Sequence, residues 1–139
     1  MGVDCYGWVE VHDPSSRNDV RFSDWWSGVI RINDIVDRNY RAYGYFFDVR
    51  NPFDTSLAGR RGAPPKLSQE ALADAGDPAD LSAASWVLWS EIQANDWRTR
   101  PELGALGWEL LFTLMENLAE YYGSERVRLV IWFDHDRSV

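Results

Sequence analysis

Five consecutive apolar residues near the end of the chain, Leu129 to Phe133, limit what this sequence can fold into more than any other feature. β-Branched and aromatic side chains dominate the run, and a Gly-Ser pair that is typical of a turn precedes it at 123–124. Successive side chains of a strand point to opposite faces, so an unbroken apolar run predicts a strand that is covered on both sides. We therefore expect the rest of the chain to be built around a core strand that ends at Asp134.

A second strand is predicted almost at the start of the chain, over residues 3–11. Alternation places four residues on one face, namely Val3, Cys5, Val9 and Val11. It places four others on the opposite face, namely Asp4, Tyr6, Trp8 and Glu10. If this strand and the last one are antiparallel neighbours, Asp4 lies near Asp134.

Helices are predicted over residues 39–49 and 101–122. Asn39 can cap the first helix, while Pro101 suits the first position of the second helix and Gly123 the residue after its end. On the second helix one predicted apolar stripe comprises Leu103, Leu106, Leu110, Leu114, Leu118 and Tyr121. A further apolar flank comprises Trp108, Phe112, Met115 and Ala119, so this helix is expected to be buried most of the way round.

Shorter elements and loops fill the remaining chain. Residues 12–19 and 51–65 are rich in turn-forming residues and are predicted to be loops. Residues 20–22 suit a short strand. Residues 24–36 fit both helical spacing and a strand, and of these we favour a strand or irregular structure. Ser68 can cap a short helix that runs to Ala73, and residues 85–95 begin as a strand and continue as a helical turn.

These elements predict a single α+β domain over residues 1–139. Its sheet is small and mostly antiparallel, with the first and last strands central. The helices over 101–122 and 39–49 cover it. No apolar run approaches the ~18 residues that a membrane span needs, and no signal-peptide pattern opens the chain, so we expect a cytoplasmic protein without membrane contact.

The net charge of −8 is concentrated in one part of the chain. Residues 67–125 hold eleven acidic side chains against Arg98 and Arg100, a net charge of −9. Such a surface repels the phosphates of nucleic acids and favours a basic protein partner. The structural alternative is that the charge serves solubility alone. Four of these carboxylates share one narrow stripe of the predicted helix and are candidate binding residues: Glu102, Glu109, Glu116 and Glu120.

The candidate catalytic residues are Asp4, Asp134 and His135, at the ends of the two core strands, with Asp136 beyond them. Paired carboxylates beside an imidazole suit acid–base work or a divalent cation. The structural alternative is that Asp134 accepts backbone hydrogen bonds and that the residues after it form a solvated tail. The spacing does not fix a metal site, so we predict no metal and no cofactor.

Arg38 and Arg50, at the two ends of helix 39–49, are candidate binding residues for an anionic group. The structural alternative is that Asn39 caps the helix, Tyr40 packs, and Arg50 pairs with Asp4 or Asp134.

Several short motifs resemble a family of small uncharacterised proteins from phage and bacterial genomes. The family opens Met-Gly-Cys-Asp-Ile-His, an aromatic residue and Val-Glu, where this chain reads M-G-V-D-C-Y-G-W-V-E. Further matches are Arg38-Asn39-Tyr40, Val49-Arg50, Arg61-Gly62-Ala63-Pro64, Ser85-Trp86 with Glu91, Asp96-Trp97 and Trp132-Phe133-Asp134. The family's Cys and His fall on Val3 and Tyr6, so a Cys/His metal site is not carried over. The resemblance implies a phage or mobile-element origin and no particular activity.

No Gly-rich phosphate loop, G-x-S-x-G or H-E-x-x-H motif occurs in the sequence. We therefore predict a non-enzymatic accessory protein of a phage or mobile element. It would bind a host or toxin protein through its acidic surface, as an inhibitor or immunity-like protein. The alternative is a small metal- or nucleotide-dependent hydrolase that uses the strand-end carboxylates.

Overall fold

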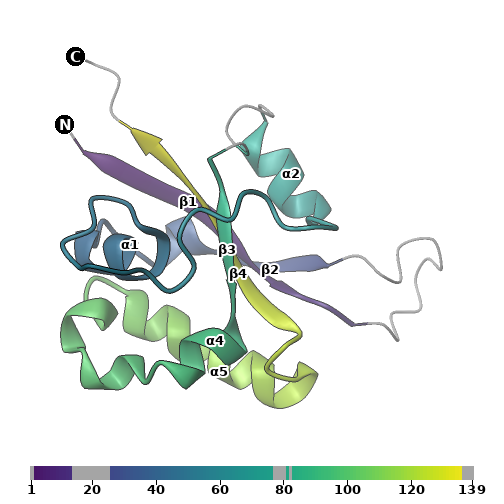
Figure 1. The fold of residues 1–139 in the computed structure, drawn as a ribbon. Coiled ribbons are helices and arrows are strands. Elements are labelled where there is room, and N and C mark those ends of the chain that lie inside the picture. The colour runs from purple at the N-terminus through teal and green to yellow at the C-terminus, as the bar shows by residue number, and fades with distance from the viewer. Residues whose placement is uncertain (1, 14–25, 77–80, 82, 136–139) are drawn as a thin grey trace.

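A computed structural model describes residues 2–13, 26–76, 81 and 83–135. Within these residues four strands form one antiparallel sheet in the order β2-β1-β4-β3. They are β1 (Val3–Val11), β2 (Ser27–Arg31), β3 (Ser85–Leu88) and β4 (Val127–His135). The first and last strands are central, as predicted, and Figure 1 shows them side by side over their whole length.

Helices cover both faces of this sheet (Figure 1). The helices α1 (Tyr40–Phe47), α4 (Trp89–Ala94) and α5 (Trp108–Tyr122) contribute to the main hydrophobic core on one face. The helix α2 (Gln69–Ala75) lies over a smaller apolar cluster on the other face. The predicted α+β class, with a long helix and a shorter helix on the sheet, is confirmed.

The apolar run in β4 serves both layers. Leu129 and Ile131 belong to the main core, whereas Val130 and Trp132 belong to the cluster under α2. All four side chains are at most 4% exposed. The alternation expected of a strand covered on both sides is therefore confirmed.

Two helix starts follow their predicted caps. The side-chain oxygen of Asn39 accepts a hydrogen bond from the backbone N–H of Ala42, and that of Ser68 accepts one from Ala71. Each cap satisfies a donor that has no partner within its helix. The Asn39 amide also donates to the carbonyls of Glu102 and Ala105 and so ties the start of α1 to the segment before α5.

The prediction of one continuous helix over 101–122 is wrong. Pro101 does open a helical turn, but this is a short 3-10 helix, Pro101–Gly104, and α5 begins only at Trp108. Leu106 and Gly107 interrupt it with positive φ angles of 60° and 92°. Gly107 also packs against the carbonyl of Ile35, where a Cβ would collide. The positive φ of Gly107 and the hydrogen bonds from Asn39 to this segment therefore prevent the continuous helix that the apolar spacing predicted.

The predicted burial of this helix on most of its circumference is also wrong. The side of α5 that faces the core is the predicted apolar flank, in which Trp108, Phe112 and Met115 are fully buried. In contrast, Leu106, Leu110 and Tyr121 are 57%, 54% and 81% exposed. The predicted main stripe is therefore split, since Leu103 is fully buried and Leu118 packs half-buried against the core.

The shorter elements agree with the sequence where the structure describes them. Residues 24–36 contain β2 and a 3-10 helix, Ile32–Asp34. Residues 85–95 form β3 followed directly by α4, and residues 51–65 contain no helix or strand. The strand predicted at 20–22 and most of the loop 12–19 lie outside the described residues. No helix in the described part of the chain is long and apolar enough to cross a membrane.

Candidate functional site

The carboxylates at the strand ends are brought together as predicted. Asp4 in β1 lies directly opposite Asp134 in β4, so the two side chains leave the same face of the sheet. His135 lies opposite Val3 through its backbone, and its side chain is outside the described part of the structure, as is Asp136. The described part of the candidate catalytic set is thus one cross-strand pair of carboxylates.

Arg38 joins this pair from the segment before α1. Its Nε donates to Asp4 Oδ1 at 2.6 Å, and the two side chains are 46% and 49% exposed. The guanidinium covers Gly2, where a Cβ would collide with it. The hydroxyl of Tyr40 accepts from the backbone N–H of Val3, which fixes the same end of β1.

Arg50 lies over the ring of Tyr40, with its Cζ 5.0 Å from the ring centroid. Asp4 has an ion-pair partner in the other candidate arginine, Arg38, which the turn before α1 carries back to β1. The predicted pairing of Arg50 with Asp4 or Asp134 stays a prediction.

A pocket of about 190 Å³ opens beside this ion pair. It lies along the half of β1 that β2 does not pair with, since β2 reaches only Trp8 to Val11. The side chain of Asn33 takes the place of a neighbouring strand there, accepting from Gly7 N and donating to the carbonyl of Cys5. The residues around the opening include Asp4, Cys5, Tyr6, Asn33, Asp37 and Arg38.

Tyr43 of α1 and Val36 complete the lining of the pocket. Tyr43 is fully buried, and its hydroxyl has no hydrogen-bond partner among the described residues. The hydroxyl end lies beside the thiol of Cys5, a weak hydrogen-bonding group. A buried polar group without a strong partner costs free energy, so this hydroxyl needs an explanation.

The weak acids that line the pocket all resist ionisation. Burial, and then the nearby Asp4, raises the pKa of the Cys5 thiol to about 11, although contact with Tyr43 opposes the rise. Burial and the charges of Asp134 and Asp4 raise the pKa of Tyr6. Burial, followed by the influence of Cys5, raises the pKa of Tyr43. The environment of the pocket therefore disfavours additional negative charge.

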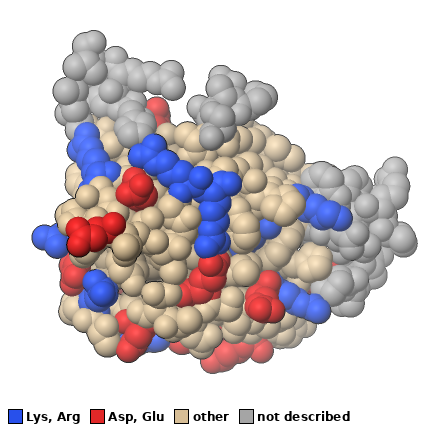
Figure 2. Space-filling model, viewed as in Figure 1, with Lys and Arg blue, Asp and Glu red and all other residues tan. Residues whose placement is uncertain are grey.

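The four candidate glutamates divide between two elements. Glu102 is exposed on the 3-10 helix Pro101–Gly104, whereas Glu109, Glu116 and Glu120 lie on α5. Arg98 pairs with Glu116 at 3.0 Å. Figure 2 shows acidic side chains along the lower edge of the face in view, where Figure 1 places α4 and α5, and acidic and basic side chains interspersed over the rest of that face.

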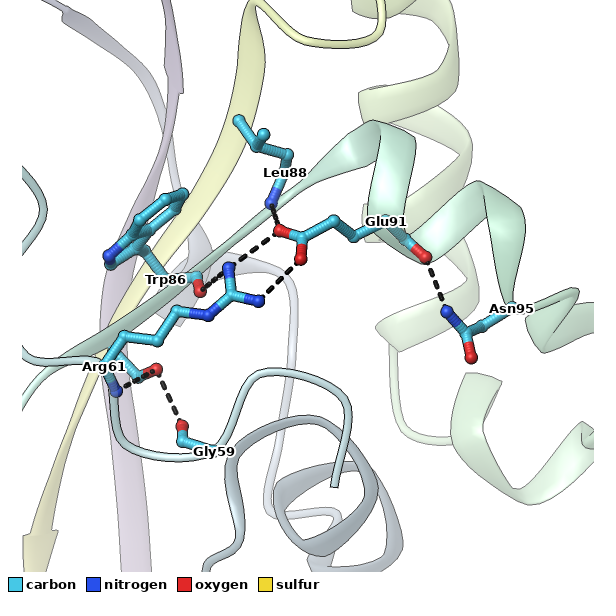
Figure 3. Close-up of polar contacts among 7 residues, drawn as sticks. Gly59, Arg61, Trp86, Leu88, Glu91 and Asn95 are labelled. Carbon is cyan, nitrogen blue, oxygen red and sulfur yellow. Dashed lines mark hydrogen bonds and ion pairs between the residues drawn. The ribbon is translucent and has the colours of Figure 1, made fainter. Parts of the chain in front are cut away.

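A second arginine–carboxylate contact fastens the long loop to β3 (Figure 3). Arg61 donates to both oxygens of Glu91 at 2.7 and 2.6 Å and also to the carbonyl of Trp86. Glu91 in turn accepts from the backbone N–H of Leu88 at the start of α4. Ser85 Oγ accepts from Arg61 N and donates to the carbonyl of Gly59. All these bonds join the chain to itself, so this network is structural.

Sequence reasoning missed the buried ion pair in the middle of the sheet. Arg128 donates to Glu10 at 2.6 Å, and the two side chains are 2% and 0% exposed. Glu10 also accepts from Ser68 N, and Arg128 lies 3.9 Å from the centroid of the Trp26 ring. This pair could have been predicted from the sequence, because the strand register that sets Asp4 opposite Asp134 also sets Glu10 opposite Arg128.

Among the described residues no group of three or more His, Cys, Asp or Glu side chains is placed to hold a metal ion. Comparison of the chain with protein-family models, with curated proteins and with solved structures finds no match.

Proposed function

We propose that this chain is a binding protein that engages a basic partner protein through the outer face of α5. We define this α5 outer face by six residues: Leu106, Glu109, Leu110, Glu116, Glu120 and Tyr121. In line with the resemblance to phage and bacterial proteins, we propose that the partner is a host or toxin protein in the cytoplasm of the host cell.

The observation that carries the proposal is the exposure of large apolar side chains on α5. Leu110 and Tyr121 are separated by about three helical turns, so they lie on one side of the helix, opposite its buried residues. Leu106 precedes them at the same end as Leu110 and is also exposed. Exposed apolar side chains along one side of a helix are found at interaction surfaces, and tyrosine is a frequent anchor of such surfaces.

The charge of the face selects the kind of partner. Glu109, Glu116 and Glu120 recur at helical spacing and form a row about a quarter to a third of a turn round the helix from Leu110 and Tyr121. Arg98 pairs with Glu116, which leaves Glu109 and Glu120 as the exposed carboxylates of the row. A basic partner would be steered by these carboxylates and anchored by the apolar side chains. Two copies of the same face would oppose like charges, which disfavours a homodimer through it.

The hydrolase alternative is not part of this proposal, because Arg38 already engages the Asp4 carboxylate on which it depends.

The test is affinity capture from a host lysate with two face variants of the protein. The first is Leu110→Ser with Tyr121→Ser, and the second is Glu109→Lys with Glu120→Lys. The matched controls make the same kinds of substitution at exposed residues outside α5. They are Leu72→Ser on α2 and Asp54→Lys in the long loop. We expect a basic protein that wild type and controls retain and that both face variants lose. Capture that the face variants leave unchanged, or no capture by wild type, would refute the proposal.

A further inference from the structure

The side chains on the outside of α5 recur in a pattern that limits the shape of what can bind there. Leu110, Leu114, Asn117 and Tyr121 follow one another at spacings of four, three and four residues, and we call these four the α5 seam. Leu110, Asn117 and Tyr121 are exposed, and Leu114 is half-buried between them. At about 100° per residue the four lie within about 60° of the helix circumference and form one straight stripe about 16 Å long.

This spacing matches a second helix better than an extended segment. Alternating steps of three and four residues are the arrangement in which two helices pack lengthwise, each inserting side chains between those of the other. A helix presents neighbouring side chains about 5–6 Å apart along such a stripe. An extended strand presents them about 7 Å apart and gains most of its affinity from a sheet edge, which a helix does not offer.

The two flanks of the seam differ in charge. On one flank Glu109 and Glu120 are both exposed, and each lies about a quarter to a third of a turn round the helix from the seam. On the other flank Leu111 is fully buried and Leu118 packs half-buried against the core. A helix that lies along the seam therefore meets exposed carboxylates of α5 on one of its sides only.

We infer that the α5 outer face binds a single amphipathic helix of the partner protein, which packs lengthwise along the seam and carries arginine or lysine along one side. The inference rests on the proposed function and adds the shape of the partner to it. Asn117 lies in the middle of the seam, so the partner helix presents a polar residue there, which fixes how the two helices are aligned. Such a contact is small and suits a transient complex.

The experiment measures the binding of three fluorescent synthetic peptides by anisotropy, at constant ionic strength and at peptide concentrations too low for self-association. The first peptide is three heptads long, with leucines along one stripe, one asparagine in the middle of that stripe and arginines along one side. The second has the same residues in an order that breaks the stripe. The third has glutamates in place of the arginines.

We expect saturable binding of the first peptide, at least tenfold weaker binding of the second and none of the third. The first peptide should also gain helical circular dichroism when it binds. Equal binding of the first two peptides would mean that charge alone is recognised and would overturn the inference. Failure of the first peptide to bind saturably, or binding of the third, would overturn it as well.

Substitutions in α5 test the seam itself. Asn117→Arg places a long cation in the middle of the seam and should weaken binding of the first peptide at least tenfold. The matched control is Gln69→Arg, an exposed amide on α2 across the sheet, which should bind like wild type. Glu120→Gln should weaken binding about two- to fivefold, the scale of one exposed charge pair, and this loss should shrink at high salt. Wild-type affinity in Asn117→Arg would exclude the seam.

Two further outcomes separate this inference from the proposed function. If the lysate capture fails, both are overturned. If a basic protein is captured and lost with Leu110→Ser and Tyr121→Ser, but Asn117→Arg retains it and the first peptide does not bind, only the helical partner is overturned. Sedimentation of the protein alone tests a second copy as the occupant. A concentration-dependent dimer that Asn117→Arg abolishes would assign the face to self-association and overturn the inference.

Discussion

The two ends of β1 carry the same chemistry in opposite surroundings. At one end Glu10 pairs with Arg128, and both are buried within the sheet under the segment that leads into α2. At the other end Asp4 pairs with Arg38, and both are about half exposed beside a pocket. The N–O distance is 2.6 Å in each pair. Contact geometry alone therefore does not distinguish the structural pair from the one at a candidate site, whereas burial and neighbours do.

The surroundings decide how each pair acts. Burial lowers the pKa of Arg128, although the charge of Glu10 opposes this shift. Removal from water is therefore the larger influence there, and the pair is sustained by bonds to the backbone of Pro65 and Ser68. Arg38 shows the reverse, because its hydrogen bond to Asp4 is the main cause of its raised pKa. The exposed pair keeps access to solvent and so to a ligand.

The largest expected effect is at the buried pair. Arg128→Ala should lower the free energy of unfolding by about 3–5 kcal/mol, because it leaves the charge of Glu10 buried without a partner. Urea denaturation followed by circular dichroism measures the change. The double variant Glu10→Leu with Arg128→Met should recover much of the loss. A loss below that of the Arg61 variant described next would contradict the assignment of this pair as structural.

The network around Arg61 should give an intermediate effect. Its side chain and that of Glu91 are 26% and 29% exposed, and Arg61→Ala should cost about 1–2 kcal/mol through lost charge-assisted hydrogen bonds. The same denaturation assay measures it. Arg60→Ala, which removes a neighbouring arginine bonded only to the carbonyl of Asp48 among the described contacts, is the matched control and should cost less.

This network also predicts a dependence on pH. The hydrogen bond from Arg61 lowers the pKa of Glu91 below its ordinary value of 4.5. The unfolded chain therefore binds this proton more readily than the folded one. The stabilisation is fully present above pH 4.5 and is lost as the pH falls through the lowered pKa. Denaturation midpoints measured from pH 6 downward should decline less in Arg61→Ala than in wild type. Parallel curves for the two proteins would contradict this.

The exposed pair should contribute less to stability than either of these. Arg38→Ala should move the denaturation midpoint less than Arg61→Ala, because water screens charges that are half exposed. The effect of Arg38→Ala should shrink further at high salt, whereas the effect of Arg128→Ala should not. Equal salt sensitivity of the two variants would remove the distinction between the two ends of β1.

The smallest effect is expected on the α5 outer face. Leu110→Ala should change the free energy of unfolding by less than about 0.5 kcal/mol, since the side chain is more than half exposed. Its neighbour Leu111 is fully buried, and Leu111→Ala should cost about 2–5 kcal/mol. A large loss in Leu110→Ala would mean that this leucine packs within the fold and is not available to a partner.

Strands and caps could be predicted because their determinants are local. The apolar run ending at Phe133 and the caps at Asn39 and Ser68 each depend on residues adjacent in sequence. The antiparallel pairing of β1 and β4 was a condition of the prediction, and under that condition Asp4 was placed opposite Asp134, as the structure confirms.

The wrong predictions concern places where residues distant in sequence bind backbone groups that a local element would otherwise use. The helix predicted from Pro101 stops because Asn39 and Asp37 take the carbonyls of Ala105 and Leu106. The pocket could not be predicted, since it forms where β2 ends and Asn33 replaces it along β1. The chain leaves the helical path at Gly107, so α5 starts afresh at Trp108. That new start determines which side of α5 faces the core.

The hydrogen bonds of Arg61 to Ser85 and Trp86 of β3 also limit how another strand can add to the sheet. β3 is an outer strand of the sheet, and such strands are common sites for aggregation or for the addition of a foreign strand. Here Arg61 and Gly59 occupy that side of β3 through Ser85 and the carbonyl of Trp86 (Figure 3). Growth of the sheet past β3 would first require the loop to detach. While the loop stays in place, a foreign strand is therefore kept from this edge of the sheet.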